Sequence, residues 1–148
     1  RAMELLHQRF TEAHERAKTG ADKISAMGRA YIAFGQEFPH YFDACARLEL
    51  HTPSGSEPTP QEMLSLQASR RPHEVVVDAL QIGQADGSVR KDLGDLAVTA
   101  RVLWGFSHGL IQIAMTKAEV MAREGIAVPQ LTQQAMDLLT FALTGRKD

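Results

Sequence analysis

Apolar side chains recur every three to four positions along most of the chain, which is the spacing of one face of an α-helix. In the first segment this stripe runs through Met3, Leu6 and Phe10, and Gly20 is expected to stop the helix. A second helix is expected from about Asp22 to Glu37. No run alternates apolar and polar residues as half-buried strands do. The pattern therefore predicts an all-α fold.

Prolines divide the middle of the chain. Pro39 disfavours helical geometry at the residue before it, so a new, aromatic-rich helix is expected from His40 to Leu50. The stretch from His51 to Pro60 contains three prolines and a glycine and is expected to be a loop. Its end is a strong helix start, because Thr59 and Glu62 have the spacing of a capping box.

Pro72 interrupts the helix that starts at Pro60. It either kinks this helix or ends it near Ser69, and we favour an end followed by a new helix, because proline lacks the backbone donor that a helix interior needs. Gly87 is expected to close that new helix.

Two long apolar helices are expected near the C-terminus. The first runs from Asp92, its expected cap, to Lys117, and it is apolar on two opposite faces, so both faces must be buried. The second runs from about Gln130 to Thr144 and follows Pro129. The most apolar run, Val102 to Met115, is too short to span a membrane.

Composition changes this picture little. The 148 residues suit one domain, and a net charge of −2 with scattered basic residues argues against nucleic-acid binding by this segment. The single cysteine, Cys45, excludes an intrachain disulfide and fits a reducing compartment, and no signal peptide is recognisable. The helical pattern begins at Arg1 without a cap, so we expect that an upstream segment is missing.

The segment from Gly105 to Gly109 matches two motifs. It has the GxSxG pattern of a hydrolase nucleophile elbow, with Ser107 as the nucleophile, but that elbow needs a strand before it, and none is predicted. It also has the GxxxG pattern, in which two small residues one turn apart let another helix approach closely. We favour helix packing over catalysis. The six histidines are dispersed, so no metal site is expected.

Four aromatic residues fall between positions 34 and 42. Such a cluster is more often core packing than a binding site, but it also suits an apolar small-molecule pocket with a few polar groups. His108, on an apolar face, is either a core histidine with one hydrogen bond or a ligand contact.

Several segments together resemble a known family. They are the run Gly87-Ser-Val-Arg-Lys-Asp-Leu-Gly-Asp-Leu, Leu103-Trp104, His108-Gly109-Leu110, and the stretch from Ala30 to Phe34 that leads to Phe38-Pro39. This pattern resembles the C-terminal regulatory domain of TetR-type transcriptional repressors, in the class whose late helix carries a Trp and a His-Gly pair. The resemblance covers about residues 21–145.

The resemblance implies a helical bundle that dimerises through its last two long helices. Residues 1–19 would be the remainder of a connecting helix, and residues 20–148 the effector-binding and dimerisation domain, while the DNA-binding helix-turn-helix domain is absent from this chain. The expected dimer interface comprises Val102, Gly105, Gly109, Ile113, Met136, Asp137 and Phe141. The expected ligand-binding residues are Phe34, Phe38, Tyr41, Phe42, Cys45, Leu80, Trp104, His108 and Ile111.

The expected function is effector sensing in a bacterial regulator, in which a small apolar or aromatic molecule alters the DNA affinity of the full-length homodimer. No enzymatic activity, cofactor or membrane contact is expected, and the location would be cytoplasmic. The alternatives are a helical interaction domain without a small ligand and a serine hydrolase that uses Ser107.

Overall fold

A computed structural model describes residues 2–50 and 57–145. These residues form α1 (Ala2–Arg16), α2 (Gly20–Glu37), α3 (Pro39–Leu50), α4 (Pro60–Asp86), α5 (Leu96–Thr116), α6 (Ala118–Arg123) and α7 (Val128–Thr144). No strand occurs in these two ranges, which confirms the all-α prediction. Nor does any helix in them have the length and apolar character needed to cross a membrane.

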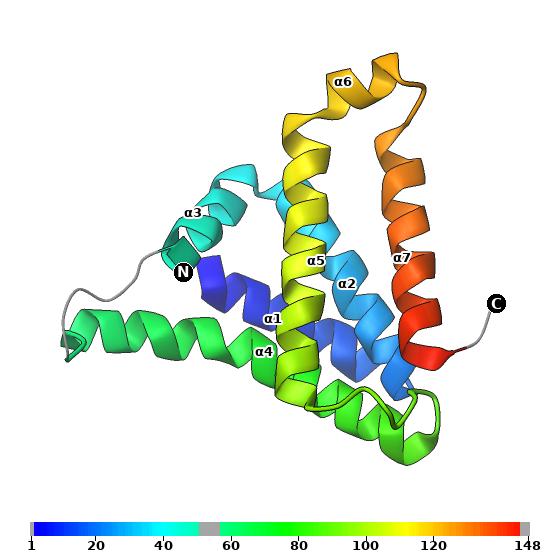
Figure 1. Ribbon diagram of the computed structural model, residues 1–148. Helices are drawn as coiled ribbons and strands as arrows, with labels where there is room; N and C mark the ends of the chain where they lie inside the picture. Colours follow the sequence, from blue (N-terminus) through cyan, green and yellow to red (C-terminus); the bar gives the residue numbers. More distant parts are fainter. Residues whose placement is uncertain (1, 51–56, 146–148) are drawn as a thin grey trace.

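The helices form two groups that share α2 (Figure 1). Helices α1, α2 and α4 pack on one another, and α3 extends from the end of α2. Helices α5 and α7 run antiparallel in front of α2, with the short α6 joining their far ends (Figure 1). The core lies where the groups meet, and its buried side chains include Leu6, Met27, Tyr31, Phe34 and Leu80.

The start of α2 rests on the end of α4. The backbone of Gly20 lies so close to that of Gly83 that a side chain on Gly20 would collide with it. Asp86 Oδ2 accepts a hydrogen bond from the Gly20 N–H at 2.8 Å, and Ser88 Oγ accepts one from the Ala21 N–H at 3.0 Å. Bonds from Ser88 and Gly20 hold the pKa of the Asp86 carboxyl below its ordinary value. The prediction that Gly20 stops the first helix was wrong, because Gly20 is the first residue of α2 and follows the N-cap residue Thr19.

Helix α4 confirms one prediction and contradicts another. Thr59 and Glu62 form the predicted capping box, and Gly87 ends the helix with a left-handed φ of 80°. However, the helix continues through Pro72, so the predicted break near Ser69 was wrong. The Pro72 side chain is fully buried, and its packing offsets the hydrogen bond that proline cannot donate.

The ends of the later helices differ from prediction by a few residues. Asp95, rather than Asp92, caps α5, and its carboxylate accepts hydrogen bonds from the N–H groups of Ala97 and Val98. Asp92 instead binds the guanidinium of Arg90, at 2.6 and 2.7 Å, which holds the pKa of that carboxyl below its ordinary value. Helix α7 starts two residues earlier than predicted, and α6 was not predicted.

Candidate functional site

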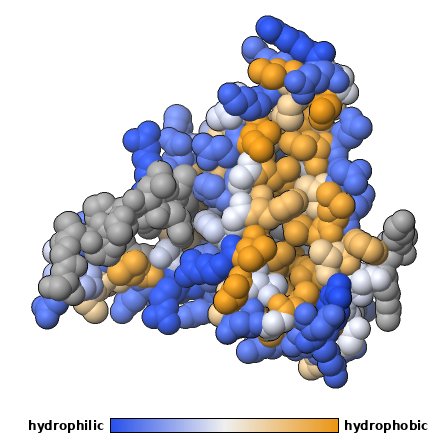
Figure 2. Space-filling view, in the orientation of Figure 1, coloured by the Kyte–Doolittle hydropathy of each residue, from blue (hydrophilic) through white to orange (hydrophobic). Residues whose placement is uncertain are grey.

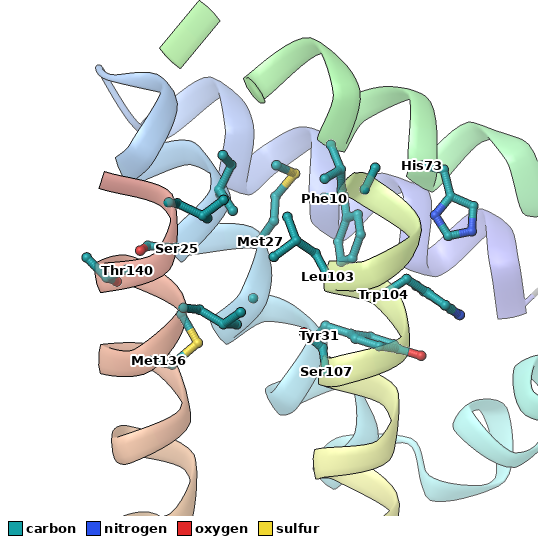
Figure 3. Close-up of a pocket in the computed structure, with 16 residues that line it drawn as sticks. Phe10, Ser25, Met27, Tyr31, His73, Leu103, Trp104, Ser107, Met136 and Thr140 are labelled. Carbon is teal, nitrogen blue, oxygen red and sulfur yellow. The ribbon is translucent and has the colours of Figure 1, made fainter. Parts of the chain in front are cut away.

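A cavity of about 50 Å³ lies between α5 and α7 and has α2 as its floor (Figure 3). Helices α1 and α4 close it through Phe10, His73 and Val76. Its volume is several times the roughly 10–15 Å³ that one water needs. The wall is mostly apolar, and Ser25, Ser107 and Thr140 add hydroxyl groups. The other lining residues are Ile24, Met27, Gly28, Tyr31, Ala100, Leu103, Trp104, Met136, Leu139 and Leu143.

Tyr31 is the centre of the aromatic packing beside this cavity. Its ring stacks on Trp104 at 4.8 Å between ring centroids and meets Phe10 edge-on at 6.0 Å. The side chain is only 1% exposed. Its hydroxyl lies 2.9 Å from His108 Nδ1, within hydrogen-bonding distance. Tyr31 therefore links α1, α2 and α5 through one side chain.

His108 is half-buried behind Tyr31. Its ring stacks on Phe42 at 4.7 Å, and burial lowers the pKa of the imidazole. A neutral imidazole protonated on Nε2 would leave Nδ1 free to accept a hydrogen bond from the Tyr31 hydroxyl. Of the two interpretations left open by the sequence, this contact favours a histidine whose position is fixed by one hydrogen bond.

His73 projects from α4 over the indole of Trp104 (Figure 3). The two rings meet edge-on, at 4.9 Å and 77°. The side chain is 6% exposed, and neither ring nitrogen has a hydrogen-bond partner in the part of the chain that is described. Burial, and then the positive charge of Arg101, lowers the pKa of His73 to about 4.

Of the predicted ligand-binding residues whose side chains the structure describes, one lines the cavity and the others lie elsewhere. Trp104 lines the cavity. His108 does not line it but forms a hydrogen bond with Tyr31, which does. Phe34, Phe42, Leu80 and Ile111 are buried in the adjoining core, Phe38 is half-buried, Tyr41 is at the surface, and the side chain of Cys45 lies outside the described residues.

Sequence reasoning did not name several lining residues as site residues, notably Phe10, Met27, Tyr31 and His73. Phe10, Met27 and Tyr31 were visible only as members of apolar stripes. His73 follows directly on Pro72, where a helix break was expected, so no face could be assigned to it.

An exposed apolar face covers the outer sides of α5 and α7 (Figure 2). Val102 is 64% exposed and Leu138 is 54% exposed, and Val98, Phe106, Ile113 and Phe141 are also exposed. A Cβ added at Gly105 or Gly109 would meet open space.

Most of the residues predicted for a dimer interface lie on this face. Val102, Gly105, Ile113, Asp137 and Phe141 are exposed, and Gly109 is half-buried. Met136 differs: it is 7% exposed and faces the cavity, with its Sδ and Cε close to Gly28. The GxSxG match lies in the middle of α5, as predicted, and not at a strand-to-helix turn.

Comparison with known proteins agrees with this architecture. The family described as "Tetracyclin repressor-like, C-terminal domain" matches residues 24–143. A solved structure described as a protein with unknown function from Rhodococcus sp. RHA1 has a TM-score of 0.75 at 19% identity, and the match covers 97% of this chain and 68% of that one. At that identity it shows the fold alone. No curated protein matches significantly. The predicted resemblance is confirmed, and the chain belongs to the family of tetracyclin repressor-like C-terminal domains, the regulatory domains of transcription regulators.

Proposed function

We propose that this domain senses a small apolar or aromatic effector and joins two copies of a regulator whose DNA affinity the effector changes. The observation that carries the proposal is that α1 contributes to the cavity wall. Phe10 of α1 is buried, lines the cavity and packs edge-on against Tyr31. A molecule entering the cavity would therefore press directly on α1.

In this proposal α1 is the end of the helix that connects the sensor to a DNA-binding domain. The cavity is small, so an effector must displace wall side chains, and the flexible thioethers of Met27 and Met136 suit that adjustment. Displacement of Phe10 would shift α1 and change the spacing of the two DNA-reading heads. Such coupling requires that the effector bind the two states with different affinity. Regulation of this kind takes place in the cytoplasm.

The proposed dimer forms through the exposed apolar face of α5 and α7. A contiguous apolar surface of this kind on a soluble domain commonly marks an interface. Two copies would form a four-helix arrangement, in which Gly105 and Gly109 let the partner's helix approach closely. Catalysis by Ser107 is not proposed, because its position in mid-helix does not give the sharp turn that an elbow needs.

Fluorescence of Trp104, the only tryptophan, tests effector sensing. Apolar and aromatic compounds are titrated into the protein, and a saturable change is expected because Trp104 lies on the cavity wall. Ser107→Leu fills the cavity and should abolish the change. Gln112→Leu, on the exposed side of α5, is the matched control and should retain it. If no compound gives a saturable response, the domain is an interaction module without a small ligand.

Sedimentation equilibrium tests the dimer. Val102→Glu with Phe141→Glu places charges on the apolar face and should convert a dimer at micromolar concentration to a monomer. Leu64→Glu is the control, because Leu64 is 67% exposed but lies on α4. A wild-type chain that sediments as a monomer, or a double variant that remains dimeric, contradicts the proposal.

A further inference from the structure

His73 forms part of the wall of two separate spaces. On one side is the apolar cavity already described. On the other is a groove of about 410 Å³ between α4 and the start of α5, lined by Arg70, His73, Glu74, Val77, Asp78, Gln81, Ala97 and Arg101. His73 therefore lies where the apolar cavity adjoins a larger groove that carries charged side chains.

His73 is a polar side chain that the fold leaves unsatisfied. Both nitrogens of His73 are buried and have no hydrogen-bond partner among the described residues. The side chain is only 6% exposed to solvent. Leaving a buried polar group unpaired costs free energy, so native proteins rarely do so without a reason. A ligand that hydrogen-bonds to His73 would supply what the protein does not.

The charges of the groove favour one kind of ligand group. Each of its two carboxylates already has a basic neighbour: Glu74 lies 4.0 Å from Arg70, and Asp78 Oδ2 lies 2.8 Å from His14 Nε2. Arg101 makes no ion pair or hydrogen bond within the described ranges. It nevertheless lines the groove beside His73.

We propose that the effector is a monocarboxylic acid with an apolar body, whose carboxylate binds His73 and Arg101 and whose body enters the cavity beneath Trp104. This inference rests on the proposed sensing function and names its ligand class. One hydrogen-bond donor and one unpaired cation match a single negative charge. A phosphate carries about two negative charges, and the carboxylates of Glu74 and Asp78 in the same groove would repel them. An amine would be repelled by the positive charge of Arg101.

Three probes that differ only in the head group test this inference: 4-phenylbutyrate, 4-phenylbutan-1-ol and 4-phenylbutylamine. Each is titrated against wild-type protein by Trp104 fluorescence. The acid is expected to bind roughly tenfold more tightly than the alcohol, as one charge-assisted hydrogen bond would give, and the amine most weakly. Arg101→Gln should remove the preference for the acid and leave the affinity for the alcohol unchanged. Arg123→Gln, an exposed arginine on α6, should preserve the preference.

His73→Leu separates ligand recognition from structure. It should weaken binding of the acid about tenfold without lowering the unfolding midpoint, because an apolar residue of similar size replaces an unsatisfied polar one. Equal affinity for acid and alcohol in the wild type, or an acid preference that survives Arg101→Gln, would overturn the ligand class and leave effector sensing intact. The proposed ligand class would also be overturned if none of the three probes changed the fluorescence of Trp104 while other apolar compounds did.

Discussion

The contact between Gly20 and Gly83 makes a sharp prediction about stability. In Gly20→Ala the new Cβ would overlap the backbone nitrogen and Cα of Gly83 and lie 2.6 Å from the carbonyl oxygen of Ala79. Non-bonded carbon atoms need about 3.5–4.0 Å, and backbone atoms cannot rotate away as a side chain can. Helices α2 and α4 must therefore move apart.

Three terms set the magnitude of this effect. Overpacking costs roughly 1–3 kcal/mol. Separation of the helices also weakens the hydrogen bonds from the Gly20 and Ala21 N–H groups to Asp86 and Ser88, each worth about 1 kcal/mol. The gain in helix propensity is at most about 1 kcal/mol. We expect a net loss of about 3 kcal/mol, which lowers Tm by roughly 6–12 °C in a domain of this size.

Urea unfolding at a fixed protein concentration measures this loss. Gly28→Ala is the matched control on the same helix, because its Cβ would meet only the end of the Met136 side chain, at 3.1 and 3.2 Å, and that flexible end can move. The control should stay within about 1 kcal/mol of the wild type. If both variants have the same unfolding free energy, the close approach of α2 to α4 does not contribute to stability as argued.

Three further predictions concern the site and the apolar face. Because burial holds the pKa of His73 at about 4, stability should fall as pH drops from about 6.5 to 4, since the unfolded chain takes up a proton that the fold excludes. A difference of this size between the unfolded and folded pKa corresponds to a loss of about 3 kcal/mol at pH 4, and His73→Leu should make the free energy of unfolding in urea depend less on pH. Tyr31→Phe leaves His108 Nδ1 without its partner and should cost about 1 kcal/mol, and a double-mutant cycle with His108→Phe should give a coupling of similar size; additivity would contradict the contact. Gly105→Ala should stabilise the isolated subunit by up to about 1 kcal/mol but weaken dimerisation in sedimentation; dimerisation equal to that of the wild type would contradict close helix packing there.

Structural features that depend only on residues close together in the sequence were predictable. The capping box of Thr59 and Glu62 and the left-handed Gly87 depend only on local chemistry, so they were found in the predicted places. The buried stripe of α1 and α2 followed from helical spacing. The role of Gly20 was mispredicted because a glycine at the end of a helix can either stop the helix or allow close contact with another one. Only the position of Gly83, more than 60 residues away, decides that here it lets two helices touch.

The candidate site was predictable only in part, because its geometry depends on distant packing. The late Trp–His helix does contribute to the cavity wall through Trp104, whereas none of the four aromatic residues between positions 34 and 42 lines it. The sequence did not indicate that Tyr31 would join Phe10 to Trp104, since the three residues lie on three different helices. The inward position of Met136 depends on the small residue opposite it, Gly28.

The most informative error concerns Pro72 and His73. A break before His73 would place it at a helix start, where polar residues are ordinary. A continuous α4 instead puts His73 on the same face as Val76 and Leu80, one and two turns further along, and buries it. Two adjacent residues thus depart from the local rules, one as a proline inside a helix and one as a buried polar group without a partner. Such departures concentrate at functional or strained sites. That they coincide where the cavity meets the groove is the strongest reason to look for the effector's polar group there.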